Sequence, residues 1–170
     1  AEVAIGTYLT NYIADRMSIT ESSANIYLTY YWGGMLVGRF IGSFFLNKFQ
    51  SSKILLIVSI LAAALILLSL ITTGSLSVWF MVLVGLCNSI MFAIIFSLSV
   101  NGLGSSTGKA SGLLSTAIVG GAFLTYAQGS LKDQFNWEIA FLIPLIAYIV
   151  IITFSLYVNA IINKSLKANS

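Results

Sequence analysis

Residues 53–73 read KILLIVSILAAALILLSLITT, and this stretch decides the fold class. After Lys53 it contains no charged residue, and its only polar side chains are those of Ser and Thr. A helix of this length covers about 30 Å at about 1.5 Å per residue. The hydrocarbon core of a bilayer has about the same thickness. An uncharged apolar run of this length therefore predicts a helix that spans a membrane.

The rest of the chain has the same character. Of its 170 residues, 58% are hydrophobic and 8% are charged, whereas about a quarter are charged in a soluble domain. Mean hydropathy is +0.98. Histidine is absent and Cys87 is the only cysteine, which excludes His-containing catalytic triads, zinc-type ligand sets and an intramolecular disulfide. With no nucleophile and base to assign, we expect a membrane protein without a cofactor that is not an enzyme.

Five further apolar runs, separated by short polar breaks, flank this stretch. The six runs are residues 1–14, 22–46, 53–73, 77–100, 109–130 and 138–162. They predict an all-α membrane protein in which six transmembrane helices form one bundle over residues 1–170. The first run is the shortest and begins at Ala1–Glu2 without a Met. We therefore expect its helix to be truncated at its start and the chain to be a fragment.

Basic residues are distributed unevenly over the predicted loops. One side holds Arg39, Lys48, Lys53, Lys109, Lys164 and Lys167, and the other holds Arg16 and Lys132. Because basic residues favour the cytoplasmic side, we expect a protein of the plasma (inner) membrane with a cytoplasmic C-terminus. The net charge of +3 is spread over short loops and forms no basic stripe, so nucleic acid is not an expected partner.

The second predicted helix carries a stripe of glycines. Gly34, Gly38 and Gly42 recur every four residues and therefore share one face. Such a groove lets another helix backbone approach closely, either as static packing or as a moving contact. Arg39 lies about 10 Å from the cytoplasmic end of this helix. Its side chain either snorkels to the interface or acts as a gate that clamps carbonyls or carboxylates.

Glu2 is the only acid within a predicted span. A carboxylate inside a membrane is a functional-site hypothesis, and the alternative is a protonated or hydrogen-bonded residue packed against the fifth helix. Glu2 and Asn11 are about 900° apart at about 100° per residue, so they point to opposite sides of a regular helix. Both can face one cavity only if that helix is broken.

Asn88 lies near the middle of the fourth predicted helix, and Phe92 falls within about 40° of it by helical rotation. An amide beside an aromatic ring suits a neutral polyol, because the amide hydrogen-bonds hydroxyls and the ring stacks on C–H groups. Hydrogen bonding between helices is the alternative role for Asn88.

Three segments carry a family resemblance. They are AEVAIGTYLTNYIAD at 1–15, YYWGGMLVGRFIGS at 30–43 and NSIMFAIIFSLSVNGLGSSTGKASGLLSTAIVGGAFL at 88–124. Together they resemble the C-terminal half of fucose/glucose/galactose-type proton symporters, a branch of the major facilitator superfamily. The resemblance implies two six-helix bundles around a central sugar site. It also implies that Asn11 and Asn88 line the cavity, and that Gly38–Arg39 belongs to a cytoplasmic gating loop.

The predicted function is that of the C-terminal half of a secondary active sugar transporter, which moves a monosaccharide with a proton by alternating access. The implied partners are a monosaccharide of the fucose, glucose or galactose class, a proton, the lipid bilayer and an N-terminal six-helix half. The predicted substrate-binding residues are Glu2, Asn11, Asn88 and Phe92, and the predicted gating or packing residues are Gly34, Gly38, Arg39 and Gly42. The alternatives are a truncated, non-transporting membrane fragment or helper subunit, and a homodimer of half-transporters.

Overall fold

The computed structural model describes the backbone of residues 1–168 and the side chains of residues 1–164, and its regular structure in that range is entirely helical. The helices are α1 (Glu2–Met17), α2 (Glu21–Leu46), α3 (Ser51–Ile71), α4 (Gly74–Val100), η1 (Gly104–Ser106), α5 (Thr107–Ala117), α6 (Gly120–Gln134), α7 (Trp137–Ala140) and α8 (Leu142–Ala168). The all-α prediction is confirmed. The side chain of Lys167, one of the basic residues used to predict orientation, lies outside the described residues.

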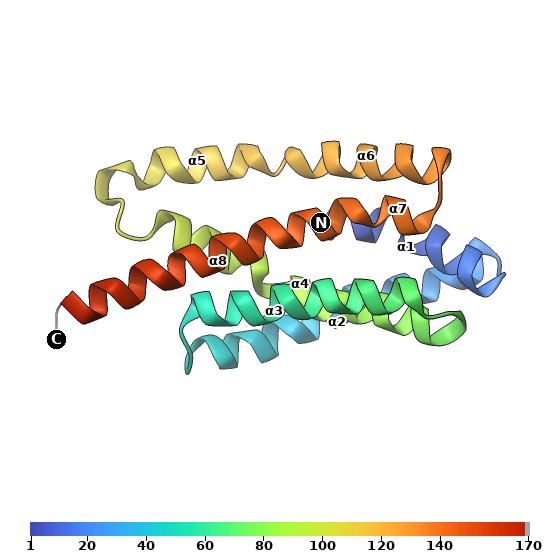
Figure 1. The fold of residues 1–170 in the computed structure, drawn as a ribbon, viewed down its shortest axis with the longest axis horizontal. Helices are drawn as coiled ribbons and strands as arrows, with labels where there is room; N and C mark the ends of the chain where they lie inside the picture. The colour runs from blue at the N-terminus through green and yellow to red at the C-terminus, as the bar shows by residue number, and fades with distance from the viewer. Residues whose placement is uncertain (169–170) are drawn as a thin grey trace.

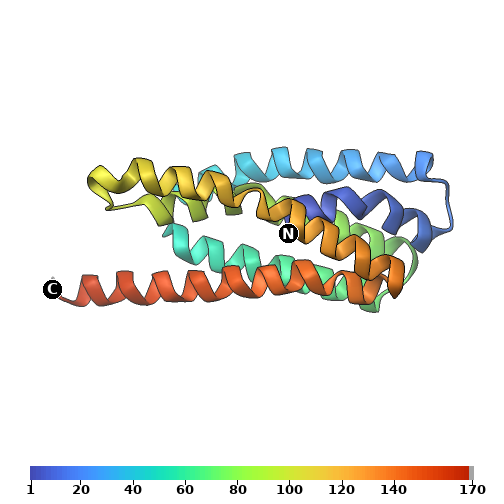
Figure 2. The ribbon, with the colours of Figure 1, turned by 90° about the horizontal axis from the view of Figure 1, so that it is seen from above.

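In chain order, the helices of the described residues make six passes, and these run along one long axis (Figure 1, Figure 2). The fifth pass consists of η1, α5 and α6, and the sixth consists of α7 and α8. The N-terminus lies about halfway along the long axis, whereas α8 ends at one end of it. The 16 residues of α1 cover about 24 Å, so Glu2 begins a helix deep inside the bundle.

Four of the passes are long and apolar enough to cross a membrane, judged by length and composition. They are Ser51–Ile71, Gly74–Val100, Gly104–Gln134 and Trp137–Lys164. Of the other two predicted spans, α1 is too short, and α2 has 26 residues but is less apolar than these four. These two helices carry much of the polar and glycine-rich sequence of the chain.

The fifth pass differs from the single run predicted at 109–130. It breaks between α5 and α6 at Ile118 and Val119, whose N–H groups donate to carbonyls three residues earlier, Ser115 and Thr116. This local tightening precedes the pair Gly120–Gly121, and adjacent small residues are a common place for helices to bend. The fifth pass is therefore two helices joined by a short 3₁₀-like turn.

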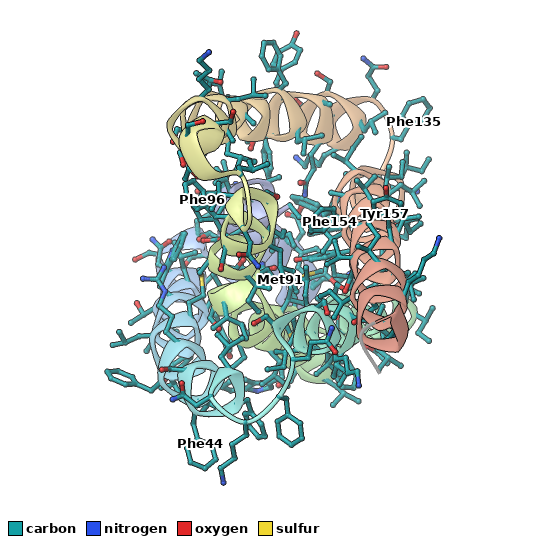
Figure 3. All side chains as sticks on the ribbon, turned by 90° about the vertical axis from the view of Figure 1, so that its left-hand side faces the viewer. Phe44, Met91, Phe96, Phe135, Phe154 and Tyr157 are labelled. Atoms are coloured by element: carbon teal, nitrogen blue, oxygen red, sulfur yellow. The ribbon has the colours of Figure 1, made fainter. Side chains whose placement is uncertain are left out.

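The core lies around α4. This helix packs against α2 on one side and α3 on another, while α3 also packs against α8 and α1 packs against α2 and α6. In the end-on view, Met91 of α4 lies near the centre, and α5 and α6 form one edge (Figure 3). Met91 is 4% exposed, so α4 lies at the centre of the bundle.

The contact between α2 and α4 depends on glycines from both helices. A Cβ atom built on Gly38 would lie 2.6 Å from the carbonyl oxygen of Leu86, and one built on Gly85 would lie 2.6 Å from that of Tyr31. A Cβ on Gly42 would collide with the side chain of Ile90. Backbone therefore packs on backbone at Gly38 and Gly85, which is the close approach that the glycine stripe predicts.

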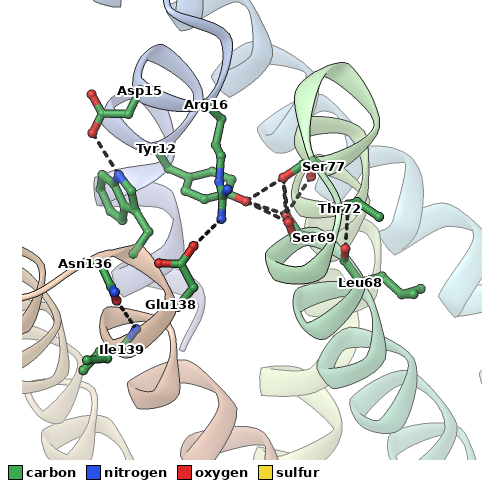
Figure 4. Close-up of polar contacts among 11 residues, drawn as sticks. Tyr12, Asp15, Arg16, Leu68, Ser69, Thr72, Ser77, Asn136, Glu138 and Ile139 are labelled. Atoms are coloured by element: carbon green, nitrogen blue, oxygen red, sulfur yellow. Dashed lines mark hydrogen bonds and ion pairs between the residues drawn. The ribbon is translucent and has the colours of Figure 1, made fainter.

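A buried polar cluster joins α1, α3 and α4 near the end of the bundle where α1 terminates (Figure 4). The hydroxyl of Tyr12 lies 2.9 Å from the Ser69 hydroxyl and 2.7 Å from the Ser77 hydroxyl. Each serine also donates to the other's backbone carbonyl, at 2.6 Å in both cases. The three side chains are fully buried, so these bonds tie the helices together where no water competes.

We predict that Gly38→Ala lowers the thermal stability of the chain in detergent by about 1–3 kcal/mol, because the added methyl group overpacks the α2–α4 contact. Gly33→Ala is the matched control on the same helix, since nothing lies within 4 Å of a Cβ built there. Alanine favours a helix over glycine by about 1 kcal/mol, so the control should not lose stability. Thermal unfolding is monitored by circular dichroism. Equal melting temperatures for Gly38→Ala and Gly33→Ala would contradict the backbone contact.

Candidate functional site

A cavity of about 1140 Å³ lies between α1, α2, α4 and the fifth pass. Its lining includes Ala1 and Leu46, the last residue of α2. Leu114 and Leu124 of α5 and α6 form part of its wall. Most of the lining is apolar, and a few polar side chains enter it, which is the usual composition of a small-molecule site.

Glu2 and Arg39 are the charged residues among those that line the cavity. Glu2 comes from the first turn of α1 and is partly buried, while Arg39 comes from the second half of α2 and is exposed. Their charges attract each other, but neither takes part in the ion pairs found among the described residues. Both groups are therefore available to a ligand in the cavity.

Phe92 contributes an aromatic wall. It lines the same cavity and is 51% exposed, and its ring lies against that of Phe96, with centroids 6.0 Å apart. Ser89, one turn earlier on α4, also lines the cavity. The structure therefore brings together three of the predicted site residues, Glu2, Arg39 and Phe92.

Asn88 does not line this cavity. It is 4% exposed and lies between α2, α4 and α8. Its Nδ2 donates to the Tyr31 hydroxyl at 3.0 Å, and its Oδ1 accepts a hydrogen bond of 2.6 Å from the Tyr148 hydroxyl. This geometry matches the alternative interpretation of Asn88, a hydrogen bond between helices.

Asn11 is also outside the cavity. Its Nδ2 donates to the Glu21 carboxylate at 2.7 Å, across the short connection between α1 and α2. Because α1 is one continuous helix from Glu2 to Met17, Glu2 and Asn11 point to different sides, as the helical rotation predicts.

The three glycines of the α2 stripe have different surroundings. Gly38 and Gly42 are buried against α4, whereas a Cβ on Gly34 would meet Leu86 at an ordinary contact distance of 3.8 Å. The contact at Gly38 places α2 so that the next residue, Arg39, lines the cavity.

Sequence reasoning missed two tyrosines, Tyr31 and Tyr148. Both are fully buried. The hydroxyl of Tyr31 donates to the backbone carbonyl of Glu2 at 3.4 Å, so hydrogen bonds connect Tyr148, Asn88, Tyr31 and Glu2 in a chain from α8 to α1. The sequence feature that could have revealed them is a tyrosine in the middle of an apolar helix, because a buried phenol usually finds a hydrogen-bond partner.

The sequence profile of the Major Facilitator Superfamily matches residues 1–167. The chain belongs to the Major Facilitator Superfamily. It is 42% identical over 150 residues to the glucose/galactose transporter of Brucella abortus and 31% identical over 157 residues to the L-fucose-proton symporter of Escherichia coli. These matches cover 87% and 91% of this chain, and 36% of each relative.

A solved structure of this superfamily has the same fold. The crystal structure of FucP in its outward conformation superposes with a TM-score of 0.88 at 30% identity, covering 92% of this chain and 38% of FucP. The chain thus spans little more than a third of the length of the proteins it matches. The resemblance to the sugar:proton symporter branch is confirmed, as are an integral membrane location and the expectation that the chain is no enzyme.

We predict that Tyr148→Phe destabilises the chain by about 1–3 kcal/mol, because it keeps the ring but leaves the buried Asn88 Oδ1 without its donor. Tyr157→Phe is the control on the same helix, since Tyr157 is 67% exposed. Thermal unfolding of both variants in the same detergent measures the difference. If the two variants melt together, the hydrogen bond between Tyr148 and Asn88 contributes no stability.

Proposed function

We propose that this chain forms the C-terminal half of the central cavity of a sugar:proton symporter that works by alternating access. The observation that carries the proposal is the cavity itself, in which Glu2, Arg39 and Phe92 converge between α1, α2, α4 and the fifth pass. The names of the relatives, a glucose/galactose transporter and an L-fucose-proton symporter, support a monosaccharide as the substrate.

The cavity offers the groups that a neutral sugar needs. Phe92 presents a half-exposed ring that can stack on sugar C–H groups. The guanidinium of Arg39 donates hydrogen bonds to hydroxyl oxygens, and the carboxylate of Glu2 accepts them from hydroxyl groups. In this proposal Asn88 acts indirectly, because it holds Tyr31, whose hydroxyl bonds the backbone of Glu2.

Glu2 is also the proposed site of proton exchange within this half. Among the residues that line the cavity, it alone carries a carboxyl group. When ionised, this group only accepts hydrogen bonds, and when protonated it also donates one. A proton on Glu2 therefore changes which sugar hydroxyls it can bind and removes its attraction to Arg39.

The proposed partner is an N-terminal six-helix half. The chain covers 36% of each relative and 38% of FucP, so the matched proteins have room for a second bundle. The fifth pass supports the same view, because none of the described residues of α5 is buried and nothing lies within 4 Å of a Cβ built on Gly108 or Gly112. A second bundle would cover this surface.

We predict that the chain retains transport when it replaces the matching 150-residue segment of the Brucella abortus transporter. Uptake of labelled glucose and galactose, driven by a proton gradient in vesicles, is the measurement. Phe92→Ala in this graft should weaken sugar binding by about tenfold, equivalent to about 1.4 kcal/mol, whereas Phe44→Ala on the exposed far side of α2 should not. If the graft reaches the membrane and unfolds cooperatively but transports no sugar, the result would favour the alternative that the chain is a non-transporting fragment.

The uneven distribution of basic residues supports an inner-membrane orientation with a cytoplasmic C-terminus. We predict that cysteines introduced as Ser51→Cys and Ser106→Cys, in a Cys87→Ser background, react with an impermeant maleimide from the cytoplasm. Those introduced as Ser18→Cys and Gln134→Cys should react only from outside. The reverse pattern would invert the proposed orientation.

A further inference from the structure

A second hollow lies at the end of the bundle where α1 and α6 terminate and α7 begins. This hollow is open to the surface and has a volume of about 440 Å³, within the usual range of about 300–1,000 Å³ for small-molecule pockets. Its lining residues are Asp15, Arg16, Lys132, Phe135, Asn136, Trp137 and Glu138. None of them lines the cavity that contains Glu2 and Arg39, so the two hollows are separate.

The walls of this hollow are fixed by direct contacts between α1 and α7 (Figure 4). The guanidinium of Arg16 pairs with the Glu138 carboxylate at 2.7 Å, and the indole N–H of Trp137 donates to Oδ2 of Asp15 at 2.8 Å. Each contact uses one oxygen of its carboxylate, Oε1 of Glu138 and Oδ2 of Asp15. The second oxygen of each group is free of the hydrogen bonds found in the described residues.

The charges that line the hollow cancel. Asp15 and Glu138 supply two negative charges, and Arg16 and Lys132 supply two positive charges. A site with no net charge has little attraction for an ion, whereas its mixture of donors and acceptors suits a neutral compound with several hydroxyl groups. The amide of Asn136 adds a donor, because its Oδ1 caps the N–H of Ile139 and leaves Nδ2 free of that bond.

Phe135 supplies an apolar face beside these polar groups. Its side chain is 61% exposed and projects away from the bundle in the end-on view (Figure 3). The ring of Trp137 is buried and has the ammonium group of Lys132 5.5 Å from its centroid. Phe135 is therefore the ring that a sugar could stack on, while Trp137 forms the floor.

We propose that this hollow is a second, outer binding site for a monosaccharide. The choice of a sugar as the ligand rests on the proposed transport function, and the hollow itself rests on the contacts between α1 and α7. Asp15 and Glu138 accept hydrogen bonds from sugar hydroxyls through their second oxygens, Asn136 donates one, and Phe135 stacks on the ring. The site holds sugar at the end of the bundle where α1 and α6 terminate, apart from the central cavity.

The test uses Trp137 as the reporter. In the full chain in lipid nanodiscs, Trp32→Phe and Trp79→Phe leave it as the single tryptophan, and both replaced residues are exposed. Glucose, galactose and fucose are titrated separately, with mannitol as the osmotic control. We expect a saturable change in Trp137 fluorescence with at least one sugar, and Phe135→Ala should weaken that binding by about tenfold.

Two matched variants separate binding from folding. Phe123→Ala on α6 removes another exposed ring (72%) that lies outside the hollow and should leave the titration unchanged. Asn136→Ser keeps a side chain that can cap α7 but removes the amide donor, so it should weaken binding while circular dichroism stays the same.

Three results would overturn the outer site. The first is that the fluorescence of Trp137 in a folded chain shows no saturable change with any of the three sugars. The second is that the change persists in both Phe135→Ala and Asn136→Ser. The third is that the change disappears in Phe92→Ala, which would place the sugar in the central cavity. Uptake by the graft tests the central cavity by itself, so failure of the outer site and failure of the transport function can be told apart.

Discussion

The contact between the backbones of α2 and α4 determines the geometry of the rest of the bundle. Without side chains at Gly38 and Gly85, each helix comes within van der Waals distance of the other's carbonyl oxygens. In a bilayer, helices gain little from burying apolar surface against each other, because lipid is equally apolar. Close packing at small residues is therefore a main source of attraction, and here it fixes the rotation of both helices about their axes.

That rotation decides the role of each polar side chain on α4. Asn88 is turned toward α2 and α8, where Tyr31 and Tyr148 satisfy its amide, while Phe92, one turn later, faces the cavity. An unsatisfied amide in a low-dielectric interior is costly, so the two tyrosines and the asparagine need one another. The same principle holds at the other end of the bundle, where Tyr12, Ser69 and Ser77 satisfy each other.

The described chain has a compact part and an uncovered part. Among the four passes long and apolar enough to cross a membrane, α4 is the most buried. In α4, 61% of an apolar stretch of 18 residues is buried, whereas none of such a stretch in Gly104–Gln134 is buried. The fifth pass nevertheless forms one wall of the cavity through Leu114 and Leu124. In the alternating-access function proposed above, this surface is where a second half would meet the chain, through an interface that can open and close.

The sequence by itself predicted an all-helical membrane protein and the order of its apolar helical runs. Long uncharged runs have to become helices in lipid, since only a helix satisfies its own backbone within one segment. It also determined that Gly38 lies at a close helix contact and that Glu2 and Asn11 diverge, because both follow from helical periodicity. The family followed from short stretches of residues in a fixed order.

Only the tertiary structure decided which polar residues meet. Helical rotation places Asn88 and Phe92 on roughly the same face, but a face of that width can contact two neighbours. Only the positions of α2 and α8 show that Asn88 belongs to a buried network and Phe92 to a cavity. The pairing of Arg16 with Glu138 joins residues 122 positions apart in the sequence. No local pattern encodes such a contact, because it depends on how α1 and α7 are brought side by side.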